Sequence, residues 1–282
     1  MDMVCEKNSD KEFDFDNDPI EPLIEGNWVK ANGTTLGADC GIGIAAQMAV
    51  LTSNNIKHGP IECLITVDEE TGLTGAFALE KDFMNGTVLL NLDSEDEGEI
   101  FIGCAGGIDT LAHFNFKKEP VPEKHIAYNI KVYGLQGGHS GDDIHKNRGN
   151  ANKILNRFLW MADRDYEMQL SEFDGGNLRN AIAREAKAIV LVPENSKQDF
   201  LSSFKQFASD VKFEYEHNEP YLKIQLEETE MPDYITDEKT RKNLLNALYA
   251  CPHGILEWST RMEGMVETST NLASVKYQDG NK

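Results

Sequence analysis

The stretch IECLITVDEETG (61–72) joins a short apolar run to three consecutive acidic residues. The run Ile61–Val67 is too short for a typical helix and predicts a buried strand. Thr87–Leu92 (TVLLNL) is a second such run, and it ends at Asp93. The apolar residues 42–53 predict a buried helix, and residues 73–80 predict a short one. Strands that alternate with helices in this way indicate an α/β fold with a parallel or mixed sheet.

The pattern changes after the glycine-rich stretch GCAGG (103–107). Approximately alternating apolar residues predict strands with one solvated face at 109–116 and 127–133. Further strands are predicted at 186–192, 221–225, 255–259 and 270–277. Helices are predicted over 150–165, after a capping box formed by Ser196 and Asp199, and after a capping residue at Thr236. We therefore expect two domains, an α/β domain at 1–106 and an α+β domain with an antiparallel sheet at 107–282.

The chain carries 48 acidic and 27 basic residues, for a formal net charge of -21. A surface with this charge repels phosphate backbones and anionic lipid, so we expect neither nucleic acid nor a membrane as partner. The five cysteines are scattered and form no CxxC pair, which favours reduced thiols. No apolar run reaches the length of a membrane span, and no signal peptide is recognisable at the start of the chain. Together these features predict a cytoplasmic protein.

Acidic residues recur where strands end or a helix begins. Asp39 stands among glycines just before the predicted helix at 42–53, where it could cap that helix or bind a metal. Glu69 and Glu70 follow the first predicted strand, and Asp93 ends the second. Ligands bind beyond the carboxyl ends of strands in open α/β sheets, and like charges gathered there need a cation. The alternative for each acid alone is a solvated surface charge, but the combination predicts a metal site.

The residue types leave the metal open. Oxygen ligands alone suit magnesium, calcium or manganese, whereas zinc normally takes histidine as well. One of two neighbouring glutamates can bind metal while the other takes a proton from water. Covalent catalysis has no support, because the sequence contains no GxSxG, P-loop or HExxH motif.

Two polar groups in the second half are further candidates. His139 lies in the glycine-rich loop GGHSG (137–141), although a lone histidine in a loop is more often simply exposed. The stretch NLRNAI (177–182) could bind a carboxylate.

These segments together resemble the aminoacyl-histidine (Xaa-His) dipeptidases, which are two-zinc peptidases related to carnosinase and peptidase T. The matching stretches are MDMVCEKN (1–8), WVKANGTTLGADCGIG (28–43), HGPIECLITVDEETGLTGAFAL (58–79), NLDSEDEGEIFIGCAGG (91–107), GLQGGHSGDDIH (134–145), GNANKILNRFL (149–159), GGNLRNAIAREA (175–186) and VETSTNLASV (266–275). The resemblance implies hydrolysis of dipeptides of the Xaa-His type, or of broader specificity, in a cytoplasmic enzyme.

The resemblance also implies a role for each candidate. Asp39 would bridge two zinc ions, for which manganese or cobalt could substitute, with Glu70 and Asp93 as further ligands. Glu69 would be the general base. The first domain would be part of the catalytic domain, and the second would be a lid that also forms a homodimer.

Three residues complete the implied site. Asp2 would orient a metal-binding histidine through its ring nitrogen. His139 would come from the lid to stabilise the oxyanion. Asn180 would hold the C-terminal carboxylate of the substrate.

The chain departs from the family's pattern at several points. One metal histidine of the family would fall just before Met1, and the other lies near a C-terminal end that has no counterpart here, as does the lid arginine. Ala183 stands where relatives usually have proline. The chain is therefore expected to correspond to the middle of a longer enzyme.

Two alternatives stay open: an inactive remnant that only folds or dimerises through its lid, and a tripeptide aminopeptidase or deacylase on the same scaffold.

Overall fold

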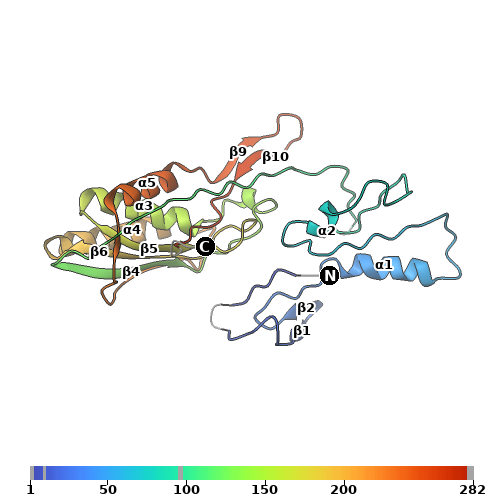
Figure 1. Cartoon of the computed structure of the whole chain (residues 1–282), viewed down its shortest axis with the longest axis horizontal. Coiled ribbons are helices and arrows are strands. Elements are labelled where there is room, and N and C mark those ends of the chain that lie inside the picture. Colours follow the sequence, from blue (N-terminus) through green and yellow to red (C-terminus); the bar gives the residue numbers. More distant parts are fainter. Residues whose placement is uncertain (1–2, 9–10, 95–97, 278–282) are drawn as a thin grey trace. The chain divides into compact units, whose positions relative to one another are not determined.

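The computed structural model describes residues 3–8, 11–94 and 98–277. Its packing divides the chain into two units, Met1–Gly106 and Gly107–Lys282 (Figure 1). Whether the two units correspond to a partial catalytic domain and a lid stays a prediction.

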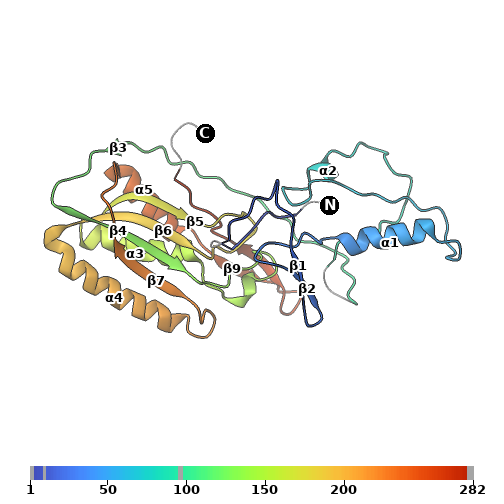
Figure 2. The ribbon, with the colours of Figure 1, turned by 90° about the horizontal axis from the view of Figure 1, so that it is seen from below.

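The second unit is built on a four-stranded antiparallel sheet. Its strands are β4 (His125–Tyr133), β5 (Gln169–Gly175), β6 (Ala186–Pro193) and β7 (Lys223–Glu228). Their order is β5-β6-β4-β7, so β5 and β7 form the edges (Figure 2). The predicted antiparallel sheet of the second half is confirmed.

Helices α3 (Ala151–Asp165), α4 (Lys197–Glu214) and α5 (Glu238–Ala250) pack with this sheet around one core. Alternate residues of β4, including Tyr128 and Ile130, point into this core because side chains alternate across a strand. Phe158 of α3 and Phe200 of α4 meet there, with ring centroids 5.4 Å apart. Burying such side chains stabilises the fold by about 1.5–3 kcal/mol each. The core therefore holds together the sheet and helices that support the loops of this unit.

Shorter elements complete the second unit. Strand β3 (Lys118–Glu119) pairs with β8 (Ile235–Thr236), and β9 (Gly254–Trp258) forms a hairpin with β10 (Val266–Thr270). Short 3-10 helices lie at Ile144–Lys146 and Glu194–Ser196. Beyond β10, Val275 exchanges two backbone hydrogen bonds with Gly175, which ties the chain back to the edge strand β5.

Several details of the second half differ from expectation. Residues 109–116 are irregular, and the strand predicted at 270–277 lies earlier, at Val266–Thr270. Ser196 does precede α4, but its side chain makes no capping bond. Asp237 rather than Thr236 caps α5, because the Thr236 side chain is buried and lies near the carbonyl of Ser171 and the Tyr277 hydroxyl.

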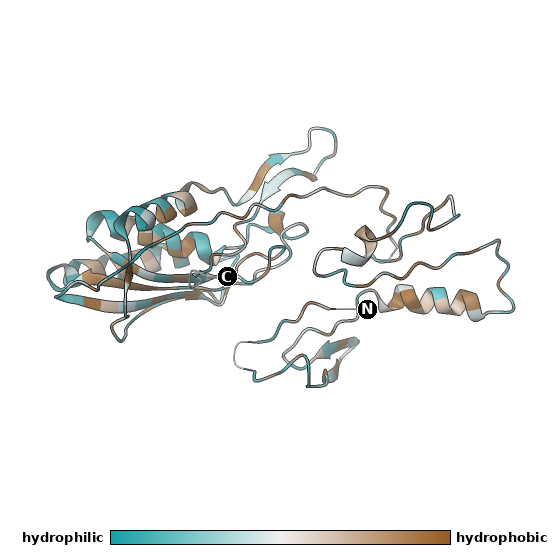
Figure 3. Cartoon of the chain, in the orientation of Figure 1, coloured by the Kyte–Doolittle hydropathy of each residue, from teal (hydrophilic) through white to brown (hydrophobic). Residues whose placement is uncertain are grey.

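The first unit contains a hairpin of β1 (Pro22–Glu25) and β2 (Trp28–Ala31), helix α1 (Gly41–Thr52) and one turn of helix, α2 (Thr74–Phe77). The predicted helices are confirmed, but the expected burial of α1 is wrong, since Gly43 is its one buried residue. Figure 3 shows apolar residues along much of this helix.

The strands predicted at Ile61–Val67 and Thr87–Leu92 are not formed. Both segments are irregular, and apolar side chains such as Val67 and Leu89 are 67% and 76% exposed. A strand needs neighbouring backbone to accept and donate its hydrogen bonds, and the described residues offer these segments no ladder partner. The mixed sheet expected in the first half is therefore absent from the described part of the chain.

Within the described residues, no helix has both the length and the apolar character needed to cross a bilayer.

Candidate functional site

Asp39, Cys40 and Asp93 come together at the start of α1. One ligand atom from each residue lies within 4.8 Å of the other two. The Cys40 thiol donates a hydrogen bond to the carbonyl of Leu92 (2.8 Å), which joins the two chain segments. Cys40 is the N-cap of α1 and makes no side-chain capping bond, so the alternative role of Asp39 as the helix cap is wrong. The described residues thus hold two of the predicted metal ligands side by side.

The two carboxylates of this cluster influence each other. The pKa of Asp39 is raised, first by partial burial and then by a hydrogen bond and charge repulsion from Asp93. Such a pair either shares a proton or takes up a cation, which removes the repulsion. Carboxylate oxygens and a thiolate are ligands that zinc accepts, and manganese accepts the oxygens. The donor set therefore fits a divalent metal ion.

Glu69 and Glu70 lie in the loop that leads to α2, outside this cluster of ligand atoms. Glu69 is exposed and Glu70 is half-buried. Their neighbour Asp68 turns inward on the loop, where its carboxylate accepts hydrogen bonds from the hydroxyls of Thr71 (2.6 Å) and Thr74. These bonds lower the pKa of Asp68. Asp68 therefore has a local structural role, and Glu69 and Glu70 are left as the candidates for chemistry.

Asp2, the residue expected to orient a histidine ligand, lies outside the described residues.

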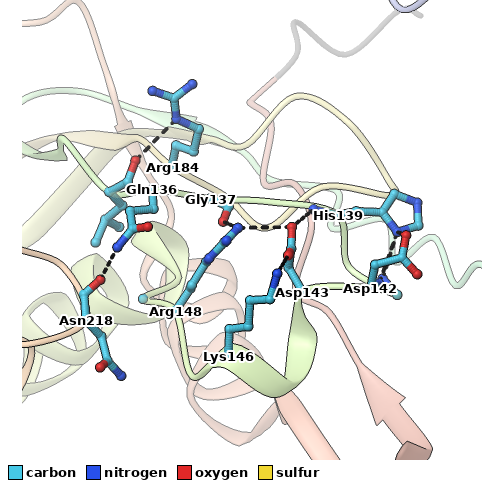
Figure 4. A network of polar contacts seen from close by, with 12 residues as sticks. Gln136, Gly137, His139, Asp142, Asp143, Lys146, Arg148, Arg184 and Asn218 are labelled. Atoms are coloured by element: carbon cyan, nitrogen blue, oxygen red, sulfur yellow. Dashed lines mark hydrogen bonds and ion pairs between the residues drawn. The ribbon is translucent and has the colours of Figure 1, made fainter. Parts of the chain in front are cut away.

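His139 and Asn180 are neighbours in the second unit. The backbone N–H of Ser140 donates to the carbonyl of Asn180 (2.7 Å), and His139 forms a β-bridge with Ala181. Half of the His139 side chain is exposed. Figure 4 shows this loop with the charged residues that surround it. His139 and Asn180, the two site residues predicted in the second half, are thus brought to one place, on segments about forty positions apart in the chain.

Comparisons with known proteins show which sequences and structures this chain resembles. The chain is 42% identical over its whole length to the cytosol non-specific dipeptidase of Escherichia coli, of which it covers 58%. It also matches a crystal structure of aminoacylhistidine dipeptidase from Vibrio alginolyticus, with 43% identity and a TM-score of 0.69, over 99% of this chain and 57% of that one. The chain is a homologue of these dipeptidases.

The chain spans a little under three fifths of the length of these relatives. Residues 125–219 match the peptidase dimerisation domain of the M20 family, a segment that runs from the start of β4 to the turn after α4. An uncharacterized protein of Bacillus subtilis is 31% identical over 207 residues, or 68% of this chain and 51% of that protein.

The sequence alone does not reveal two residues of the candidate site. Cys40 carried no signal, because only the fold brings its thiol to Leu92 and Asp93. Asn271 donates its side-chain N–H to the carbonyl of Ala181 (2.8 Å) and so supports the segment that holds Asn180. Its position within the stretch VETSTNLASV was the one available hint.

Proposed function

We propose that this chain holds part of the active site of a metal-dependent dipeptidase. The observation that carries the proposal is the convergence of Asp39 and Asp93 in a homologue of two dipeptidases. The substrates are dipeptides of the Xaa-His type, or a broader set of dipeptides, since one relative is called an aminoacylhistidine dipeptidase and the other a non-specific one.

Two zinc ions are the proposed cofactors, with manganese or cobalt as substitutes. Asp39 would bridge them, and Asp93 and Glu70 would each add a carboxylate. When bound, such a cation lowers the pKa of water and polarises a carbonyl group. The exposed Glu69 would take the proton from the attacking water, a role that a carboxylate can fill. Asp2 would orient a histidine ligand.

The second unit would contribute the groups that hold the substrate. An N–H donor on His139 would stabilise the oxyanion that develops at the scissile carbonyl. Asn180 would bind the C-terminal carboxylate of the dipeptide. The dimerisation-domain match supports a homodimer formed through this unit. The cytosolic relative supports a cytoplasmic location.

Metal titration tests the ligand assignment. We expect Asp39→Asn to weaken zinc or manganese binding, measured by calorimetry, at least tenfold, because it removes a ligand and not merely a neighbour of one. Asp68→Asn is the matched control. Its carboxylate lies in the same unit but is bonded to Thr71 and Thr74, so metal affinity should not change. Equal losses in both variants would contradict the assignment.

Hydrolysis of β-Ala-His and of other dipeptides tests the activity, with Glu69→Ala as the control that lacks the base. Turnover that depends on added metal and disappears in Glu69→Ala supports the dipeptidase. Parallel assays with tripeptides and N-acyl amino acids distinguish an aminopeptidase or deacylase on this scaffold.

A second candidate function is a non-catalytic protein that binds metal or dimerises without turnover. The position of Glu69 and Glu70 outside the Asp39 cluster favours it. Metal binding that responds to Asp39→Asn, together with turnover no higher than that of Glu69→Ala, would identify this second function.

A further inference from the structure

The two ring nitrogens of His139 lie in different surroundings. Nδ1 accepts hydrogen bonds from the backbone N–H groups of Gly141 (3.2 Å) and Asp142 (3.3 Å). A nitrogen that accepts two N–H groups has no room for a proton of its own, so the neutral ring carries its proton on Nε2. In the described part of the chain, no hydrogen bond or ion pair engages Nε2. The loop thus presents an N–H donor.

A charged group close to Nδ1 could oppose this arrangement. The carboxylate of Asp142 lies 3.4 Å from Nδ1, where it could accept a hydrogen bond from a proton placed on that nitrogen. Its side chain is 86% exposed, however, and water weakens such a pair. The two backbone donors are fixed parts of the loop, whereas the Asp142 side chain lies mostly in solvent.

The turn that carries these donors is closed by Asp143. Its backbone N–H donates to the carbonyl of His139 (2.9 Å), and its carboxylate accepts the backbone N–H of His139 (2.9 Å). These two bonds hold residues 139–143 in one conformation, with the N–H groups of Gly141 and Asp142 directed at the ring. The orientation of the imidazole therefore depends on where the Asp143 carboxylate lies.

Two cations fix that carboxylate (Figure 4). Lys146 contacts one oxygen of Asp143 (2.5 Å), and Arg148 contacts the other (3.0 Å). The hydrogen bond from Lys146 is the main reason why the pKa of Asp143 is lowered, so this carboxylate is charged at neutral pH. Arg148 also donates to the carbonyl of Gly137. A Cβ atom at Gly138 would lie 2.0 Å from the Arg148 guanidinium, so glycine is needed there for the close approach.

We propose that Asp143 and Arg148 are positioning residues that hold His139 with its proton on Nε2, ready to donate to the carbonyl oxygen of a bound peptide. The inference rests on the proposed function for the identity of the acceptor. The tautomer and its dependence on Asp143 are properties of the loop itself.

Nitrogen-15 NMR of the histidine rings in the full chain reads the tautomer directly. His139→Gln assigns the His139 signals. In the unaltered protein we expect an unprotonated Nδ1 and a protonated Nε2 at neutral pH. In Asp143→Ala we expect both signals to move toward the average of two tautomers, because the turn is released. Arg148→Gln should move them in the same direction by a smaller amount.

Asp142→Asn is the matched control, since it removes the neighbouring charge but keeps both backbone donors. Its His139 signals should stay those of the Nε2–H tautomer. Asp143→Asn retains an oxygen that can accept the His139 N–H, so its His139 signals should remain close to those of the Nε2–H tautomer. This variant can be measured if Asp143→Ala does not fold. A protonated Nδ1 in the unaltered protein, or an unchanged signature in Asp143→Ala, would overturn the proposal.

A kinetic readout separates the inference from the proposed activity. In a chain that hydrolyses dipeptides, Asp143→Ala should lower kcat about 100-fold with little change in KM, because the donor acts on the transition state. An inactive chain that still shows the Nε2–H signature and its loss in Asp143→Ala contradicts the dipeptidase proposal and supports the positioning role. An active chain whose His139 signals are unchanged in Asp143→Ala supports the dipeptidase proposal and contradicts the positioning role.

Discussion

His253 is the described residue whose protonation should most affect stability. Burial, together with the nearby charge of Lys153, lowers its pKa from 6.5 to about 4. Its Nδ1 lies 3.3 Å from the side-chain amide nitrogen of Asn150, which donates to it. The folded chain therefore keeps this ring neutral near pH 5, where the unfolded chain would bind a proton.

This difference predicts a pH dependence of stability. The folded pKa is below the unfolded one, so the contribution is complete above pH 6.5 and is lost as the pH falls toward 4. The loss is at most about 1.4 kcal/mol per pH unit. Urea unfolding at several pH values measures it, and His253→Gln should show a shallower loss between pH 6.5 and 4. Parallel curves for the two proteins would show that His253 does not titrate on unfolding.

At the residue scale, the sequence reveals which acids to consider but not how they are used. Asp39 stands out because glycines surround it, and Asp93 because an apolar run ends there. Asp68 has the same local setting as Glu69, yet its carboxylate is taken up by two threonines, which only the turn of the backbone decides. Asp143 likewise looks like surface charge until the loop folds around it.

The helix starts give a prediction at the scale of elements. The Asp237 carboxylate accepts the backbone N–H of Thr240 (3.0 Å) at the start of α5 and that of Lys117 (2.8 Å). Asp237→Ala should lower the free energy of unfolding by about 1–2 kcal/mol, since it leaves both donors unpaired. Chemical denaturation measures the loss.

Ser196→Ala is the matched control for this prediction. Ser196 also precedes a helix, but its side chain makes no capping bond to α4. We expect Ser196→Ala to leave the free energy of unfolding nearly unchanged. A loss as large as that of Asp237→Ala would mean that the serine hydroxyl caps α4 in solution.

Periodicity predicts the elements of the second half well, because the core against which their apolar faces pack is formed by the same segment of chain. Over much of their length β4 and β6 alternate buried residues with less buried ones, and α3 buries one apolar side against them. At α5 the predicted cap, Thr236, lies one position before the observed cap, Asp237. The two residues are adjacent, and both are of types that favour N-caps. The apolar runs at 61–67 and 87–92 match a buried strand, but a strand also requires a partner, which a local pattern does not contain.

At the scale of the whole molecule, packing is uneven along the chain. The buried core lies between Ala127 and Val275, whereas Gly43 is the one described residue of the first unit that is buried. Local opening costs little where few side chains are buried. We expect amide hydrogen exchange to be slowest in β4 and β6 and fast throughout residues 11–94, including α1. Protection of α1 equal to that of α3 would contradict this.

Glu219 accepts the backbone N–H groups of Gln136 (2.7 Å) and Gly149 (2.7 Å), on either side of the His139 loop, and it is 2% exposed. The turn after α4 would otherwise be an attractive place to insert an affinity tag or a fluorescent label, since short exposed turns usually tolerate insertions. Here an insertion would displace the carboxylate that anchors both ends of the loop. Protein engineers should instead use the turn between β9 and β10, where Arg261 and Glu263 are exposed and the adjacent strands form a hairpin of their own.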